Sequence, residues 1–375
     1  MIKPKPKNQD AVELAGTKNQ DCVLLFTTYE NRKIAAILNN NVLQKVFVKE
    51  KGMPRGTICL GKVSEIKAEI GCAFLIIADK QKCFIQLAEL KDEYNLTRPG
   101  QSVKCGDSFV VKITKEPAKN KLSSASTFLS EEEEQYRTVG STRTDYSVLK
   151  QGKSYIDNAI HYFNILTDRV NQDNRIVAKP TTGNAESDLQ DKINQNRFRV
   201  ITDDSEIYDK LTQPDSVFQN PAHEFVLLQK YEDSLVGLNV LFGLKEKITE
   251  SLNRHVWLKS GADIYIDRTE ACTVIDVNSG KSSKKEAAKE HYLSLNKEAA
   301  AEICHQISLR NLSGIILIDF INMNDEKDRG ELIDFMKELC KINAPEMHIV
   351  GITKLGIMET TRQKTGPSLH EQFES

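Results

Sequence analysis

The sequence Thr273-Val-Ile-Asp-Val-Asn-Ser-Gly280 decides the fold, together with the later stretch Ile315-Ile-Leu-Ile-Asp-Phe-Ile-Asn-Met323. Each stretch is an apolar strand pattern that carries one aspartate, Asp276 in the first and Asp319 in the second. Strands made of Ile, Val and Leu are expected to be buried, and an unpaired carboxylate in such a strand costs several kcal/mol. The two aspartates therefore predict a cationic partner, for which a bound divalent metal is the natural choice.

The residues around these stretches alternate between helix and strand patterns. Residues 285–309 carry apolar side chains at three- and four-residue spacing, which is typical of an amphipathic helix. Residues 328–342 indicate a second helix before a strand at 348–353, and residues 263–277 form a strand, a turn and a strand. This order predicts a mixed, largely parallel sheet covered by helices, with the strand at 315–320 buried on both faces.

The ends of the two aspartate-bearing strands predict a metal site. Asp276 and Asn278 project to the same side of their strand because side chains alternate along it. A right-handed crossover between neighbouring strands would bring Asp319 to the same carboxyl edge, where α/β sheets bind their ligands. Two carboxylates and an amide suit Mg²⁺, which supports phosphodiester hydrolysis by polarising the phosphate and activating a water. The spacing alone leaves open that both aspartates are hydrogen-bonded structural residues.

Composition limits the class of protein without naming it. The 375 residues are enough for two or three domains, and 51 Lys and Arg against 53 Asp and Glu give no overall attraction to nucleic acid. The eight cysteines include no Cys-x-x-Cys pair, so buried free thiols in a reducing cytoplasm are expected. No run of about 18 apolar residues occurs, which predicts a cytoplasmic protein with no membrane partner.

Longer motifs identify a family. Residues 260–369 contain Ser-Gly-Ala-Asp-Ile-Tyr-Ile-Asp-Arg-Thr-Glu-Ala, both aspartate stretches and Gly-Pro-Ser-Leu, in an order that resembles the catalytic domain of the ribonuclease E/G family. In that family the positions matching Asp276 and Asp319 bind Mg²⁺, and the position matching Asn278 orients the site. The resemblance also implies a DNase I-like catalytic sheet with an RNase H-like support region. Lys281, directly after Asn278-Ser-Gly280, is either a phosphate contact or a solvated loop residue.

Short strands between residues 55 and 113 predict a small barrel of the oligonucleotide-binding type. The expected strands are 57–64, 72–77, 82–87, 101–103 and 109–113. The resemblance implies an RNA-binding barrel of the ribosomal S-one type, in which Phe74, Phe84 and Lys121 match the family's RNA contacts. Pairing across the turn at 78–81 would bring both rings to one face, where stacking is worth about 1–3 kcal/mol per base of single-stranded RNA. Burial of both rings in the barrel core is the alternative.

Two features of the family are missing from this sequence. The Arg-Thr pair of the family's 5′-monophosphate pocket would align with Ala178 and Lys179, and the four carboxylates of Glu131–Glu134 would repel a phosphate. We therefore expect direct entry at single-stranded sites without sensing of the 5′ end. The family's zinc-binding Cys-Pro-x-Cys segment would follow Gly366-Pro-Ser-Leu369, but residues 370–375 do not contain it. We therefore expect a short, diverged member without structural Zn²⁺ or a zinc-linked dimer. Other self-association stays open.

The expected fold class is a multidomain α+β and α/β protein. Its expected parts are N-terminal strands of the RNase H-like region at 1–52, the barrel at 53–127, a diverged sensor-like region at 128–220, an RNase H-like connector at 221–256 and the catalytic α/β domain at 257–375. The patterns within the N-terminal and middle parts predict strands at 22–27, 33–38 and 42–48 and helices at 153–168 and 244–252.

The predicted function is Mg²⁺-dependent endonucleolytic hydrolysis of single-stranded RNA, such as mRNA or a rRNA precursor, in RNA processing or decay. A catalytically decayed RNA-binding protein that keeps the fold is the first alternative. The second is a phosphohydrolase that acts on small nucleotides, which would leave the barrel without a role.

Overall fold

The computed structural model describes residues 21–117, 121–143, 146–177, 198–213, 226–233, 235–280, 288–323, 325–344 and 346–374. The chain divides into two compact units, one made of residues 1–31, 36–46 and 172–374 and the other of residues 32–35 and 47–171. No helix within the described ranges is long and apolar enough to cross a membrane.

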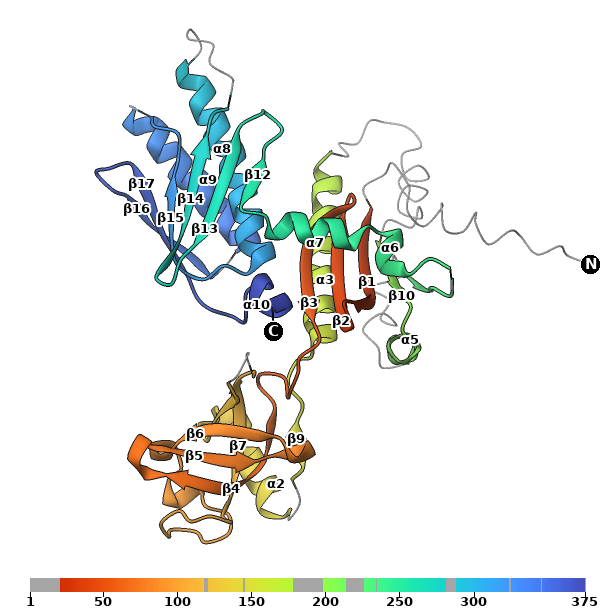
Figure 1. The fold of residues 1–375 in the computed structure, drawn as a ribbon, viewed down its shortest axis with the longest axis vertical. Coiled ribbons are helices and arrows are strands. Elements are labelled where there is room, and N and C mark those ends of the chain that lie inside the picture. Colours follow the sequence, from red (N-terminus) through yellow and green to blue (C-terminus); the bar gives the residue numbers. More distant parts are fainter. Residues whose placement is uncertain are drawn as a thin grey trace, which may run out of the picture. The chain divides into compact units, whose positions relative to one another are not determined.

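The N-terminal strands form a sheet with two strands from much later in the chain (Figure 1). The strands are β1 (Cys22–Tyr29), β2 (Arg32–Asn39), β3 (Val42–Val48), β10 (Phe198–Thr202) and β11 (Val226–Lys230), in the order β11-β10-β1-β2-β3. The three strands predicted at the N-terminus are confirmed, but β10 and β11, which complete their sheet, were not predicted. The two predicted helices are α3 (Tyr155–Val177) and α7 (Leu244–Leu252), and the short helices α5 (Ser205–Leu211) and α6 (Leu238–Leu241) were not predicted.

The predicted barrel is confirmed as a closed ring of five strands. The strands are β4 (Ile58–Lys67), β5 (Cys72–Ile76), β6 (Lys82–Gln86), β7 (Ser108–Lys115) and β8 (Ser123–Ser126), and β9 (Val148–Lys150) adds to β4. They pair in the order β4-β5-β6-β8-β7, and β7 returns to β4 to close the ring. Side-chain alternation places Leu75 and Ile85 in the enclosed core, because each points inward from its strand.

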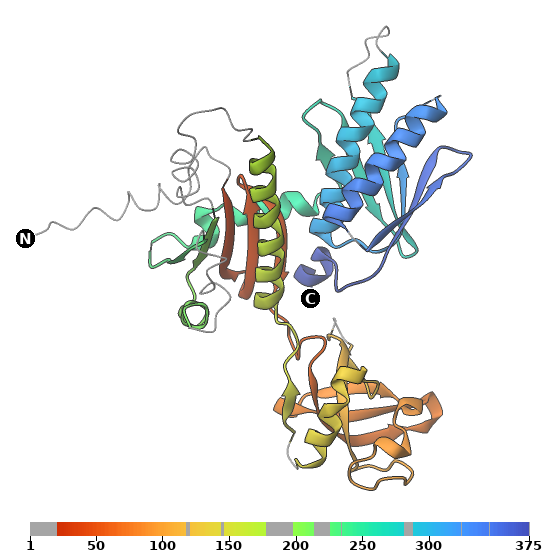
Figure 2. The same cartoon turned by 180° about the vertical axis from the view of Figure 1, so that it is seen from behind.

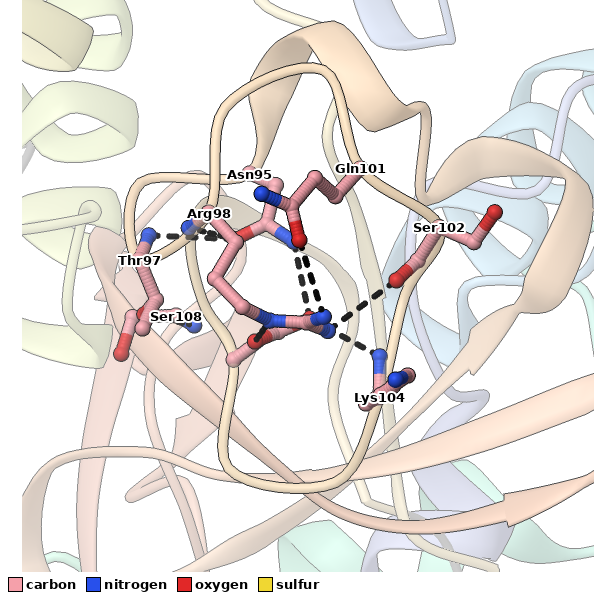
Figure 3. Close-up of polar contacts among 8 residues, drawn as sticks. Asn95, Thr97, Arg98, Gln101, Ser102, Lys104 and Ser108 are labelled. Carbon is pink, nitrogen blue, oxygen red and sulfur yellow. Dashed lines mark hydrogen bonds and ion pairs between the residues drawn. The ribbon is translucent and has the colours of Figure 1, made fainter.

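The strand predicted at residues 101–103 is not formed, and β8 takes the fifth place in the ring. Residues 95–108 instead form a loop held by side chains, with Arg98 at its centre (Figure 3). The buried carboxylate of Asp107 accepts hydrogen bonds from Arg98 Nε at 2.9 Å, Arg98 Nη2 at 2.6 Å and Asn95 Nδ2 at 2.8 Å. The Arg98 guanidinium is the main reason that the pKa of Asp107 falls to about 2. An ion pair between the buried Asp107 and the partly exposed Arg98 thus replaces strand pairing as the support of this segment.

The C-terminal sheet has six strands, of which two, β12 (His255–Trp257) and β17 (Ile357–Arg362), were not predicted. The others are β13 (Asp263–Arg268), β14 (Cys272–Asn278), β15 (Gly314–Asp319) and β16 (Met347–Ile352), and the order in the sheet is β12-β13-β14-β15-β17-β16. Only β14 and β15 pair in parallel, and the other pairings are antiparallel. The prediction of a largely parallel sheet is therefore wrong. A tight turn after β16, in which the Thr353 N–H donates to the Ile357 carbonyl at 2.9 Å, reverses the chain and inserts β17 beside β15.

Helices α8 (Ala288–Arg310) and α9 (Glu326–Asn343) cover one face of this sheet (Figures 1 and 2). In β14, Ile275 and Val277 point into the core beneath them, while Val274 and Asp276 are exposed on the other face. The same holds in β15, where Ile315 is 50% exposed. The prediction that this strand is buried on both faces is therefore wrong, because apolar residues at exposed positions hide the alternation in the sequence.

Candidate active site

Asp276 and Asp319 lie side by side on the open face of the C-terminal sheet. The two residues are register partners in the parallel pair β14–β15. Partners in neighbouring strands point to the same face, with strand axes about 4.8 Å apart. The structure therefore brings together the two carboxylates that the sequence predicted to meet, near the carboxyl ends of both strands.

Asn278 is fixed beside this pair. Its amide Nδ2 donates a hydrogen bond to Asp276 Oδ2 at 3.1 Å, so the amide orients the carboxylate. The backbone then turns at Gly280, which has a φ of +63° and packs against the carbonyl of Gly261 so closely that a Cβ would collide with it. A glycine is required there because a side chain would push the end of β14 away from the start of β13.

Both aspartates are exposed to solvent, which contradicts the burial assumed from the strand patterns. The desolvation cost that called for a cationic partner is therefore absent. What remains in favour of a metal is the adjacency of two negative charges, which repel each other until a cation lies between them.

The donor set at this edge fits Mg²⁺. This ion binds oxygen, keeps several of its waters and is commonly held by one or two carboxylates together with substrate phosphate. Asp276 and Asp319 supply two carboxylates on an open face with room for water and phosphate. Within the described ranges, no group of three or more His, Cys, Asp and Glu side chains is arranged to hold a metal.

In the barrel, Phe74 and Phe84 meet on the outside. They are cross-strand partners of β5 and β6, with ring centroids 6.2 Å apart and planes at 69°. Both rings are half-buried and neither belongs to the barrel core, since their neighbours Leu75 and Ile85 fill it. The structure thus disfavours the alternative that both rings are core residues.

The lysines near the aromatic pair differ from the prediction. Lys121 is exposed and lies two residues before β8, the strand whose Ser124 pairs with Phe84. Lys67 was not predicted, yet its ammonium lies 5.6 Å from the centre of the Phe74 ring. Only the pairing of β4 with β5 reveals this contact, because six residues of turn and strand lie between Lys67 and Phe74 in the sequence. Lys281 lies outside the described residues.

The acidic segment Glu131–Glu134 is less negative than its sequence suggests. Glu133 is only 7% exposed and accepts hydrogen bonds from Lys112 Nζ at 2.7 Å and Lys150 Nζ at 3.1 Å. The Lys112 ammonium is the main reason that the pKa of Glu133 falls to about 2. Glu134 pairs with Arg137 at 2.6 Å, so two of the four carboxylates are neutralised within the barrel unit. Ala178 and Lys179 lie outside the described residues.

The sequence matches a family model over residues 102–365, described as the ribonuclease E/G family. The chain belongs to the ribonuclease E/G family. The match includes β14, β15 and the aspartate pair, so the resemblance seen in the motifs is confirmed.

Individual members of the family share either a short, well-matched segment or most of the chain. Ribonuclease E of Synechocystis sp. is 40% identical over 150 residues, which is 40% of this chain and 22% of that protein. Ribonuclease G of Escherichia coli is 36% identical over 129 residues, 34% of this chain and 26% of that protein. A ribonuclease E/G-like protein of Porphyra purpurea is 26% identical over 385 residues, 90% of this chain and 74% of that protein. The matched segments thus span about a quarter or less of the ribonucleases E and G named here.

Proposed function

We propose that this member of the ribonuclease E/G family is a Mg²⁺-dependent endonuclease that hydrolyses single-stranded RNA. The observation that carries the proposal is the side-by-side placement of Asp276 and Asp319 on an exposed sheet face, in a chain that belongs to this family. Cytoplasmic mRNA or rRNA precursors are the substrates of choice.

Each residue of the site has a separate task. Asp276 and Asp319 hold the ion, and the Asn278 amide fixes the orientation of Asp276 through its hydrogen bond. When bound, Mg²⁺ supplies a Lewis acid for a phosphate oxygen and lowers the pKa of a bound water. The exposure of both carboxylates would leave a bound ion accessible to substrate phosphate.

The barrel is proposed to capture the RNA strand. Phe74 and Phe84 offer ring faces outside the core, and stacking tolerates any base. The Lys67 ammonium lies 5.6 Å from the centre of the Phe74 ring and 3.5 Å from Glu65. Lys121 precedes the strand that pairs with β6, in a protein that has no net attraction to nucleic acid.

Cleavage is proposed not to depend on a 5′-monophosphate. The support is the replacement of the family's Arg-Thr pair by Ala178 and Lys179 in the sequence. Equal cleavage of two oligonucleotides that differ only in a 5′-monophosphate or a 5′-hydroxyl is expected. A strong preference for the monophosphate would overturn this part of the proposal.

The central test is degradation of an A/U-rich single strand in the presence of Mg²⁺ by the wild type and by Asp319→Asn. Internal cuts by the wild type that disappear in the variant and on chelation of the metal are expected. Binding of RNA without cleavage by the wild type would instead identify a decayed RNA-binding protein. Hydrolysis of small nucleotides alone would identify a phosphohydrolase.

A further inference from the structure

The open face of the C-terminal sheet carries three aromatic rings beside the aspartate pair. The residues are His255 and Trp257 of β12 and Tyr265 of β13. Tyr265 is the register partner of Asp276, and His255 is the register partner of Tyr265. Because register partners share a face, the row of side chains across the sheet reads His255, Tyr265, Asp276, Asp319.

The rings are fixed by contacts with each other and with polar neighbours. The His255 ring stacks on Tyr265 with centroids 4.5 Å apart and planes at 18°, and it meets Trp257 edge to face, also at 4.5 Å. His255 Nε2 lies 3.0 Å from Asp263 Oδ2, which sets the orientation of the imidazole. The Arg254 guanidinium lies 5.4 Å from the centre of the Tyr265 ring. His255, Trp257 and Tyr265 therefore form an aromatic platform whose rings are already held in place by these contacts.

Trp257 is the part of this platform that meets solvent. Its side chain is 68% exposed, although a large aromatic ring gains most by burial. Trp257 pairs with Asp263, and Asp263 pairs with Asn278, so the indole stands two strand spacings, about 10 Å, from the amide that orients Asp276. Packing of the hairpin alone does not account for an indole left so exposed next to the candidate metal site.

We propose that Trp257, supported by His255 and Tyr265, is a stacking subsite for a base of the RNA next to the phosphate that a metal ion at Asp276 and Asp319 would bind. This inference rests on the proposed function and adds a residue that positions the substrate. A base suits this place better than a phosphate, because the carboxylates of Asp263 and Asp276 lie near the rings and repel anions. Stacking accepts every base, so the subsite fixes where the strand lies relative to the metal instead of reading its sequence.

The sequence contains one tryptophan, so indole fluorescence reports on this subsite alone. The experiment uses the full chain carrying Asp319→Asn, to prevent cleavage, with Mg²⁺ and a fluorescein-labelled A/U-rich RNA. Anisotropy of the label measures binding, and tryptophan emission measures stacking. An oligomer of the same length made of abasic ribose phosphates is the matched ligand. Quenching by the RNA and none by the bound abasic oligomer is expected.

Two substitutions separate stacking from a structural role. Trp257→Leu is expected to weaken RNA binding at least about fivefold, since stacking is worth about 1–3 kcal/mol per base, while Trp257→Phe restores most of the affinity. Val350→Ala is the control, because Val350 is also 68% exposed and lies on the edge strand β16 at the opposite side of the sheet. It should bind as the parent does.

The outcomes are distinguishable from those of the proposed function. RNA that binds by anisotropy without changing tryptophan emission overturns the stacking subsite and leaves the nuclease proposal intact. Equal quenching by the abasic oligomer, or unchanged affinity of Trp257→Leu, does the same. Specific quenching together with a wild type that never cleaves RNA supports the subsite and overturns the nuclease.

Discussion

The β5–β6 hairpin of the barrel and the β13–β14 hairpin of the C-terminal sheet each place two side chains next to each other on one face, but these side chains differ in their chemistry. Both are antiparallel pairs with one buried face and one exposed face. In the barrel the partners outside the core are the half-buried Phe74 and Phe84, and on the open face of the sheet they are Tyr265 and Asp276. Strand pairing thus selects which side chains meet, and the residue types decide whether the place suits stacking or metal ligation.

The two hairpins differ in how their buried faces are covered. The barrel closes on itself and encloses its core, and a second buried cluster covers the outside of β4 and β7, so the outer side chains of β5 and β6 remain accessible. The C-terminal sheet stays open, and α8 and α9 cover one face only. Its other face therefore displays the aspartates and the aromatic rings together.

The largest expected effect is that of removing a proposed metal ligand. Asp276→Asn should lower Mg²⁺-dependent RNA cleavage by about a thousandfold or more, because loss of metal-based charge stabilisation costs several kcal/mol. Asp334→Asn is the matched control, since Asp334 is an exposed carboxylate on α9, which covers the other face of the sheet. Initial rates with a labelled oligonucleotide measure both. If Asp276→Asn retained its activity, Asp276 would not be a metal ligand of the site.

A smaller effect is expected at Asn278. Its alanine variant loses the hydrogen bond that orients Asp276, and such supporting contacts to metal ligands are typically worth about 10- to 100-fold in metal affinity or activity. The Mg²⁺ concentration for half-maximal cleavage should rise accordingly. An unchanged Mg²⁺ dependence would show that Asp276 is held in place without the amide.

Phe84→Leu tests whether the aromatic pair of the barrel stacks on RNA bases. Leucine keeps an apolar side chain but removes the ring, so RNA affinity should fall about five- to twentyfold. The barrel should remain folded, because Phe84 lies outside its core. Fluorescence anisotropy for binding and circular dichroism for folding test the two parts. If Phe84→Leu lost its fold while its folded fraction bound RNA with unchanged affinity, Phe74 and Phe84 would have a structural role and would not contact RNA.

The smallest expected effect concerns the loop at residues 95–108. Asp107→Asn removes the partner of Arg98 and should destabilise this loop by about 2 kcal/mol at neutral pH. The folded-state pKa of Asp107, about 2, lies below the ordinary value of 3.8, so its contribution is complete above pH 4 and is lost as the pH falls through 2. Protection of the loop amides from hydrogen exchange should be lower in the variant than in the wild type at neutral pH. This difference in protection should become smaller as the pH falls from about 4 to about 2. A constant difference down to pH 2 would contradict the ion-pair account.

Most helices and strands could be predicted from the sequence, whereas their pairing could not. Local periodicity located β1 to β3, α7, β13 to β15, α8 and α9, because side-chain alternation is a property of neighbouring residues. Periodicity did not predict segments whose structure depends on contacts with residues distant in the sequence. Residues 101–103 look like a strand but are held as a loop by Asp107, and β17 follows a turn too short to show as a break.

Sequence motifs place this chain in its family and single out Asp276, Asn278 and Asp319 as the proposed site. Only the tertiary structure decided their surroundings. It placed the aspartates as partners of adjacent strands, on an exposed face and next to Tyr265 on β13. Residue type limits which chemistry is available, but burial depends on which face of a sheet the helices cover, and that follows from contacts between residues far apart in the chain.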